Sequence, residues 1–165
     1  MKILGCDPGV HGGIAIVEIN DGTAPRLVDA IDIPVTGVGA KDVWTCSRSA
    51  PGFSRITRNA LIERAQAMPK QGASSGFKYG RAVGALEGVL ACCEIPMTIV
   101  EPSAWKKFYR LRGGDKEGGR QRALQLLPAA HAWLARKKDH GRADAALVAL
   151  YGAHKMALTG AKHAA

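Results

Sequence analysis

The sequence predicts an α/β fold built on one sheet of mixed strand direction. Two observations lead to this class. Strand-like segments come first, over residues 1–9, 13–19 and 27–33, and short turns separate them. Helical and strand-like segments then alternate over residues 60–158, an order typical of parallel strands joined by helices. The 165 residues are enough for a single domain, residues 1–165, with a sizeable core.

Most expected elements follow from apolar spacing and from the residues that end them. Apolar side chains at helical spacing predict a long helix over residues 77–95. Pro34 ends the third strand, and Pro128 ends a helix. The tail over residues 160–165 is expected to fray. The remaining expected elements are strands over 60–63 and 97–102 and helices over 104–111, 118–127 and about 142–158.

Residues 35–59 do not fit this pattern. The segment has no clear period, it is rich in Ser, Arg, Thr and Gly, and so long a structureless connection is unusual in a compact domain. When residues 42–59 are back-translated and read one base out of frame, codon choices exist that encode an amphipathic helix. We therefore interpret the segment either as the product of a compensated frameshift or as an idiosyncratic loop. The nucleotide sequences of related genes decide between the two.

The chain is strongly basic, with a net charge of +9 and an isoelectric point of about 9.7. This balance favours a polyanionic partner. Acidic residues are sparse near the basic ones, so few of these charges find a local partner. The distribution therefore favours nucleic acid over a merely solvated surface. The basic residues form two clusters, one of Lys106, Lys107, Arg110, Arg112, Lys116, Arg120 and Arg122, the other of Arg136, Lys137 and Lys138.

The sequence does not predict a membrane protein or a disulfide-rich secreted one. No apolar run approaches the length of a transmembrane helix, and Asp7 and Pro8 interrupt the first apolar stretch too early for a signal peptide. The four cysteines show no CxxC spacing, and Cys92 and Cys93 are adjacent. We expect a reduced, cytoplasmic protein without a disulfide framework.

Three acidic residues stand at the ends of apolar elements. Asp7 ends the first strand before a Pro-Gly turn, Glu63 ends the strand over 60–63, and Asp144 lies in the first turn of the last helix. Strand ends with a helix packed across them bring such groups together, where they raise one another's pKa. A divalent cation removes this penalty, and oxygen ligands select Mg²⁺ or Mn²⁺. A site that holds two such ions can hydrolyse phosphodiester bonds, so the pattern predicts that chemistry. An Asp before Pro-Gly, as at Asp7, is also typical of a simple turn.

A fourth ligand or a general base is expected just before Asp144. His140 and Asp144 are four residues apart and share one helix face if the helix begins early. Gly141 instead suggests that the helix begins just after His140, in which case Asp139 or His140 caps it. Asp139 and His140 therefore stay alternatives for this role.

Four blocks of the sequence contain these residues in order. They are ILGCDPGVHGGIAIV, ALIERAQAMPKQGASSGFKYGRAVGALEGVL, VEPSAWKKFYRL and KKDHGRADAALVALYG. Together they resemble the RuvC-type Holliday junction resolvases of the RNase H-like superfamily, over nearly the whole chain except about 35–59. The resemblance implies an RNase H-like fold with a five-stranded mixed sheet flanked by helices, a Mg²⁺-dependent endonuclease and a homodimer. It carries Asp7, Glu63 and Asp144 over as catalytic metal ligands.

The chain departs from this family at two points. The family usually has its fourth ligand three residues before the last Asp, where this chain has Gly141. The family also often has an aromatic wedge in the loop after the Glu, where this chain offers Gln66 or Met68. These departures bear on the completeness of the site and on how the protein opens a junction.

Basic residues near these motifs are candidates for binding DNA through its phosphate backbone. A junction is recognised by its shape, so few side chains that contact bases are expected. Trp105 and Phe108 are interpreted as core residues rather than as residues that stack on bases. The candidates are Lys70, Lys78, Arg81, Lys106, Lys107, Arg110, Lys116 and Arg120.

The leading interpretation is a structure-selective endonuclease that cuts four-way junctions, or related branched DNA such as flaps and forks, by two-metal hydrolysis. We expect a homodimer with no nucleotide cofactor and no membrane partner. The alternative is a DNA-junction-binding protein with a weak or inactive site. A phosphotransferase similar to sugar kinases is disfavoured, because the chain is too short for two lobes and has no adenosine-binding signature.

Overall fold

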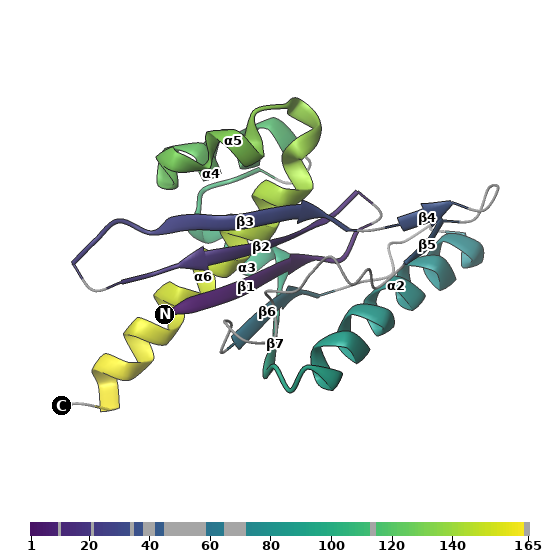
Figure 1. Ribbon diagram of the computed structural model, residues 1–165, viewed down its shortest axis with the longest axis horizontal. Helices are drawn as coiled ribbons and strands as arrows, with labels where there is room; N and C mark the ends of the chain where they lie inside the picture. Colours follow the sequence, from purple (N-terminus) through teal and green to yellow (C-terminus); the bar gives the residue numbers. More distant parts are fainter. Residues whose placement is uncertain are drawn as a thin grey trace.

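The structure is a computed structural model that describes residues 1–9, 11–20, 22–33, 35–37, 42–44, 59–64, 72–112 and 115–163. Its centre is one five-stranded sheet with the strand order β3-β2-β1-β6-β7 (Figure 1). The strands are β1 (Lys2–Asp7), β2 (Gly13–Glu18), β3 (Arg26–Asp32), β6 (Asn59–Glu63) and β7 (Met97–Val100). A second sheet is the two-stranded hairpin of β4 (Val35–Gly37) and β5 (Asp42–Trp44).

Helices lie on both faces of the five-stranded sheet (Figure 1). One face packs against α2 (Ala73–Cys92), and the other packs against the long α6 (His140–His163). No helix of the described part of the chain is both long and apolar enough to cross a membrane. The shorter helices are α3 (Pro102–Phe108), α4 (Lys116–Leu126) and α5 (His131–Leu134), with 3-10 turns at Pro128–Ala130 and Lys137–Asp139.

The sheet is mixed, as the sequence predicts. β1, β2 and β3 are antiparallel neighbours because short turns join them. β1, β6 and β7 are parallel neighbours, and α2 is the crossover between β6 and β7. The predicted α/β class, with a five-stranded mixed sheet flanked by helices, is confirmed.

Side chains along β1 and β6 point alternately to the two faces of the sheet and so belong to two separate hydrophobic cores. Leu4 and Ile62 belong to the core under α2, which also contains Leu86 and Leu90 of that helix. Ile3 and Leu61 belong to the larger core under α6. Side chains of odd number on β1 and β6 therefore point to the α6 face. This parity matters for function, because Asp7 and Glu63 share it.

Glycines allow α6 to lie directly on the backbone of β1 and β2. A Cβ atom added to Gly5 would come within 2.7 Å of the Ala149 amide nitrogen, and one added to Gly13 within 2.6 Å of the Arg142 amide nitrogen. From the helix side, a Cβ atom at Gly141 would come within 2.7 Å of the Gly12 carbonyl carbon. Real Cβ atoms do not approach other atoms this closely, so these contacts require glycine.

Two helices begin earlier than predicted. α2 begins at Ala73 rather than at residue 77, because burial of its later turns stabilises a first turn of weak helix formers, Ser-Ser-Gly. α6 begins at His140 rather than at about 142, and it continues to His163, into the tail that was expected to fray. The sequence also gave no sign of α5, which is only four residues long.

The segment over 35–59 is described only in part. Its first residues form the β4–β5 hairpin, which the sequence did not predict. The rest of the segment lies outside the described residues, so the frameshift hypothesis stays a prediction. The prediction of a single domain over residues 1–165 also stays a prediction.

We predict that Gly5→Ala strongly destabilises the fold. The added methyl group would collide with backbone atoms of Ala145 and Ala149, and neither helix nor strand can move without disturbing the core. We expect the free energy of unfolding to fall by about 3 kcal/mol or more, measured by chemical denaturation. Gly72→Ala is the matched control, because a Cβ atom there meets nothing within 4 Å; it should change stability by less than about 1 kcal/mol. Equal effects of the two substitutions would contradict this packing.

Candidate active site

Asp7 ends β1 with its carboxylate on the α6 side of the sheet. The Gly9 amide donates a hydrogen bond to Asp7 Oδ1 at 3.1 Å, which holds the side chain in the turn that follows the strand. Burial raises the pKa of Asp7, while the Gly9 hydrogen bond and the positive charge of Lys106 act in the opposite direction. The turn interpretation from the sequence and the buried carboxylate are therefore both correct descriptions of this residue.

Glu63 lies beside Asp7 because β1 and β6 are parallel and in register. Cys6 pairs with Ile62, so the next residue on each strand ends at the same edge of the sheet. The indole of Trp105, on α3, donates a hydrogen bond to Glu63 Oε2 at 2.7 Å. Burial first and the neighbouring Asp7 charge second raise the pKa of Glu63. Trp105 is thus buried, as predicted, and also orients a candidate ligand.

Asp144, on α6, is the third carboxylate of the group. Burial raises its pKa to about 7, and the charges of Asp7 and Glu63 add to that effect. Gly119 of α4 lies against it, since a Cβ atom at that position would come within 2.8 Å of Asp144 Oδ1. The structure therefore brings together Asp7, Glu63 and Asp144, from β1, β6 and α6, within electrostatic reach of one another.

Two lysines supply positive charge to this group. Lys106 of α3 lowers the pKa of all three carboxyl groups, and Lys116 of α4 lowers that of Asp7 and Asp144. The Lys106 Nζ atom also lies 5.1 Å from the centre of the Trp105 ring, which holds it near the Trp105–Glu63 hydrogen bond. Both lysines therefore lie at the candidate site rather than on a remote basic surface.

The two alternatives for the fourth position, Asp139 and His140, have different surroundings. His140 begins α6 and interacts electrostatically with Asp7, while burial and then Lys116 lower its pKa and favour the neutral imidazole. Burial opposes ionisation of Asp139, but its hydrogen bonds from the Arg136 amide and guanidinium prevail and lower its pKa. Both oxygens of Asp139 therefore bind Arg136, whereas His140 lies within electrostatic reach of Asp7.

The predicted DNA-binding residues differ in their surroundings. The guanidinium of Arg120 binds Glu117 and donates to the Leu134 carbonyl oxygen at 2.6 Å, so it joins α4 to α5. Lys70 lies outside the described residues, and of Lys78 only the helical backbone is described. Arg81, Lys107 and Arg110 are exposed. Lys106 and the exposed Lys116 interact electrostatically with the carboxylates.

Two aromatic residues of α2 escaped the sequence analysis. Burial, with the charges of Asp7 and Glu63, raises the pKa of Tyr79 to about 12, so its neutral hydroxyl lies within electrostatic reach of the site. Phe77 is 68% exposed and belongs to the same part of the helix. Both lie inside the helix predicted over residues 77–95, but no sequence motif marks either of them as functional; a stripe through Tyr79, Ala82 and Leu86 is the signal that could have found Tyr79.

Comparison with solved structures identifies the architecture. A structure of Thermus thermophilus RuvC matches with a TM-score of 0.60 and 20% identity, over 96% of this chain and 97% of that one. The chain has the RuvC fold. T. thermophilus RuvC in complex with a Holliday junction substrate matches at 0.59 and 20% identity, over 91% of each chain. A fowlpox virus Holliday junction resolvase matches at 0.55 and 11%, over 94% of this chain and 99% of that one.

The RuvC fold confirms the predicted RNase H-like architecture. At these identities the similarity establishes the fold alone. No protein-family model matches the chain, and no curated protein is similar to it. The arrangement of residues on this fold must therefore carry any argument about activity.

The donor set at the site fits a hard divalent cation. The charge of Asp7 raises the pKa of Glu63 and of Asp144, and the charge of Glu63 raises that of Asp144. A cation at this site would relieve the repulsion, and oxygen ligands suit Mg²⁺ or Mn²⁺. In the described part of the chain, no three His, Cys, Asp or Glu side chains are already close enough to enclose one ion.

We predict that Asp144→Asn stabilises the metal-free protein at high pH. The pKa of this carboxyl is about 7 in the folded protein and 3.8 ordinarily, so the folded state binds the proton more tightly. Ionisation of Asp144 destabilises the folded state. This destabilisation is absent below the ordinary pKa, grows as the pH rises, and reaches its full size above about pH 7. In EDTA at about pH 8, the variant should be more stable than the wild type by on the order of 2 kcal/mol. Chemical denaturation measures the difference.

The same comparison at about pH 4 should show almost no difference between variant and wild type, because both states then hold the proton. Asp29→Asn, on the exposed side of β3, is the surface control and should change stability little at either pH. A stabilisation by Asp144→Asn that is the same at both pH values would show that ionisation is not its cause.

Proposed function

We propose that this protein is a divalent-metal-dependent endonuclease that cleaves four-way DNA junctions or closely related branched DNA. One observation carries the proposal: three partly buried carboxylates from β1, β6 and α6 gather at the ends of parallel strands. The fold supports the choice of substrate, since one structure that shares it is a RuvC in complex with a Holliday junction. The net charge of +9 supports a nucleic-acid partner.

Asp7, Glu63 and Asp144 are the proposed metal ligands, with His140 as an additional ligand or as the general base. Two bound Mg²⁺ or Mn²⁺ ions would activate a water molecule and stabilise the leaving oxygen of the phosphodiester. The protein holds the ligands in place from outside: Gly9 binds Asp7 and Trp105 binds Glu63. Burial of the carboxylates makes their repulsion strong and the affinity for a cation correspondingly high.

His140 is suited to accept a proton. Its pKa is lowered by burial and by Lys116, so the neutral ring is present at physiological pH, and the nearby Asp7 charge stabilises the protonated ring. Lys106 and Lys116 present positive charge at the same place, where a scissile phosphate would bear negative charge. We propose that these two lysines bind that phosphate, while Arg81, Lys107 and Arg110 bind the flanking backbone.

A homodimer would place two such sites on opposed strands of a junction. The surface of α2 supports it. Gly76, Gly80, Gly84 and Gly88 recur at every fourth position, and a Cβ atom at any of them would meet nothing within 4 Å. Glycine destabilises a helix interior by about 1 kcal/mol relative to alanine, so four of them suggest a close partner. The exposed Phe77 at one end of this stripe is the candidate wedge that the loop lacks.

A junction-binding protein with a weak nuclease site is the second candidate. Two observations favour it. Gly141 stands where the fourth ligand of the resembled family usually lies, and among the described residues the carboxylates do not yet enclose a single ion. Such a protein would keep the basic surface and the junction affinity but would cleave slowly or not at all.

We predict metal-dependent, paired nicks in a synthetic four-way junction. Cleavage should require Mg²⁺ or Mn²⁺, should stop in EDTA, and should be faster than on linear duplex DNA. Asp7→Asn should lower the rate by about a hundredfold or more while it preserves junction affinity. Denaturing gels report the nicks and gel shifts report the affinity. Tight junction binding by a wild-type protein that does not cleave would favour the second candidate, and preferred cleavage of flap DNA would change the substrate.

We predict that His140→Ala and Asp139→Asn fail in different ways. His140→Ala should reduce the cleavage rate by about ten- to a hundredfold, with nearly normal stability and junction affinity. Asp139→Asn weakens the cap formed with Arg136 and should lower the free energy of unfolding by about 1–3 kcal/mol, with a normal rate for the folded protein. If Asp139→Asn abolishes cleavage by a stably folded protein, Asp139 rather than His140 is the functional residue.

A further inference from the structure

Tyr79 is a polar side chain of α2 to which the proposed function assigns no role. Ala82, Leu86 and Leu90 follow it at helical spacing, and each of the three is almost fully buried. Leu86 and Leu90 belong to the core between α2 and the sheet. Tyr79 continues this stripe by one turn toward the beginning of α2, so its side chain leaves the helix on the side of the sheet. Unlike the other three residues, Tyr79 is only half-buried.

The course of the chain places Tyr79 at the edge of the sheet where the carboxylates lie. α2 connects the parallel strands β6 and β7, so it runs antiparallel to them and begins near the end of β6. Leu86 shares a core with Leu4 of β1. Tyr79 lies about 10 Å from Leu86 along the helix axis, and Asp7 lies about 10 Å from Leu4 along the strand. The first turns of α2 therefore reach the level of Asp7 and Glu63.

The electrostatic surroundings of Tyr79 agree with this placement. Burial first, and then the charges of Asp7 and Glu63, raise the pKa of its hydroxyl, so both carboxylates lie within electrostatic reach of it. Neither accepts a hydrogen bond from it: Asp7 binds the Gly9 amide, and Glu63 binds the Trp105 indole. No other residue in the described part of the chain accepts one either. The site therefore contains a neutral donor that is available to a bound molecule.

Tyr79 lies across the carboxylates from Lys106 and Lys116. Trp105 of α3 and Ala123 of α4 belong to the core under α6, so the two lysines approach the carboxylates from the α6 face. Tyr79 approaches them from the α2 face. A group bound over the strand ends would thus meet positive charge on one side and a hydroxyl on the other.

We propose that the Tyr79 hydroxyl binds the scissile phosphate by donating a hydrogen bond to one of its non-bridging oxygens. This inference rests on the proposed function, because it is the carboxylates that select this phosphate. A neutral donor suits the position, since a lysine there would pair with Asp7 and Glu63 and compete with a cation. A hydrogen bond to an ionised oxygen is stronger than one between neutral groups. In a water-excluded site it stabilises charge that develops in the transition state.

Tyr79→Phe tests the proposal, because it removes the hydroxyl and keeps the ring. The rate of cleavage of a synthetic four-way junction, measured with Mg²⁺ at a single turnover, should fall by about tenfold or more. The thermal unfolding curve should stay that of the wild type. A variant that cleaves at the wild-type rate would overturn the proposal.

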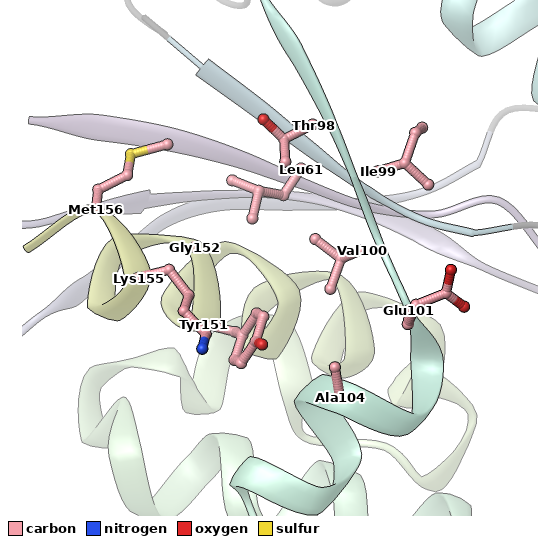
Figure 2. A pocket seen from close by; sticks show the side chains of 10 residues that line it. All are labelled: Leu61, Thr98, Ile99, Val100, Glu101, Ala104, Tyr151, Gly152, Lys155 and Met156. Carbon is pink, nitrogen blue, oxygen red and sulfur yellow. The ribbon is translucent and has the colours of Figure 1, made fainter. Parts of the chain in front are cut away.

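Tyr151 supplies the matched control. It lines a groove of about 640 Å³ between β7 and α6, together with Leu61 and Val100 (Figure 2). None of the three carboxylates is among the described residues that line this groove. Tyr151→Phe also removes one hydroxyl and should cleave at the wild-type rate. An equal loss of rate in both variants would show that the effect is not specific to the active site, and the assignment to Tyr79 would be wrong.

Phosphorothioate junctions identify the atom that the hydroxyl contacts. Sulfur replaces each non-bridging oxygen of the cleaved bond in turn, in two pure stereoisomers, and sulfur is a weaker hydrogen-bond acceptor than oxygen. With one isomer the wild type has already lost the bond, so the effect of Tyr79→Phe should shrink to about twofold or less. A full effect with both isomers would show that the hydroxyl binds another group, which contradicts the proposal.

Failure of the nuclease proposal has a different signature. A wild-type protein that binds the junction but does not cleave it with Mg²⁺ or Mn²⁺ contradicts that proposal, and the affinity then tests the contact of Tyr79 with phosphate. In gel shifts with Ca²⁺, Tyr79→Phe should bind the junction about fivefold or more weakly, and Tyr151→Phe should bind it normally. Unchanged affinity of Tyr79→Phe in such a protein would overturn the phosphate contact as well.

Discussion

The close contact between α6 and the first two strands is the constraint on which the rest of the structure depends. Gly5 and Gly13 remove side chains from the sheet, and Gly141 removes one from the helix, so backbone meets backbone. This contact sets the height of α6 above the sheet. Asp144 is brought to the level of Asp7 and Glu63 only because no side chains hold the helix further away. The same glycines thus determine both the packing of α6 on the sheet and the position of Asp144 beside the other two carboxylates.

Burial of three like charges is the second feature that organises the molecule. Each neighbour of these carboxylates offsets part of their repulsion. The Gly9 amide and the Trp105 indole donate hydrogen bonds, and Lys106 contributes positive charge. The offset is incomplete, since the pKa of Asp144 still lies near 7. Buried charges whose repulsion is only partly offset are typical of functional sites, where function is retained at the expense of local stability.

The sequence was sufficient to predict the fold class and the proximity of the three carboxylates, because strand parity and strand ends are local properties. Asp7 and Glu63 each follow an apolar run, and the parallel order of their strands brings them together. The ion pairs of Asp139 and Arg120 could not be predicted from the sequence. Each binds a residue three positions away, and such pairs form only when the short helices around them begin at particular residues. Tyr79 lies within the predicted helix, but only the packing of α2 against the sheet brings it within electrostatic reach of Asp7 and Glu63.

Gly141 has a consequence for how proteins of this fold diverge. A side chain at this position would meet the backbone of His11 and Gly12, so the position cannot regain an acidic ligand by one substitution. A ligand at this position requires a wider spacing between α6 and the turn at His11 and Gly12 than this chain has. The ligand set and the helix contact therefore evolve together or not at all. His140 is one residue earlier and on a different side of the helix, so it could supply a ligand without a side chain at position 141.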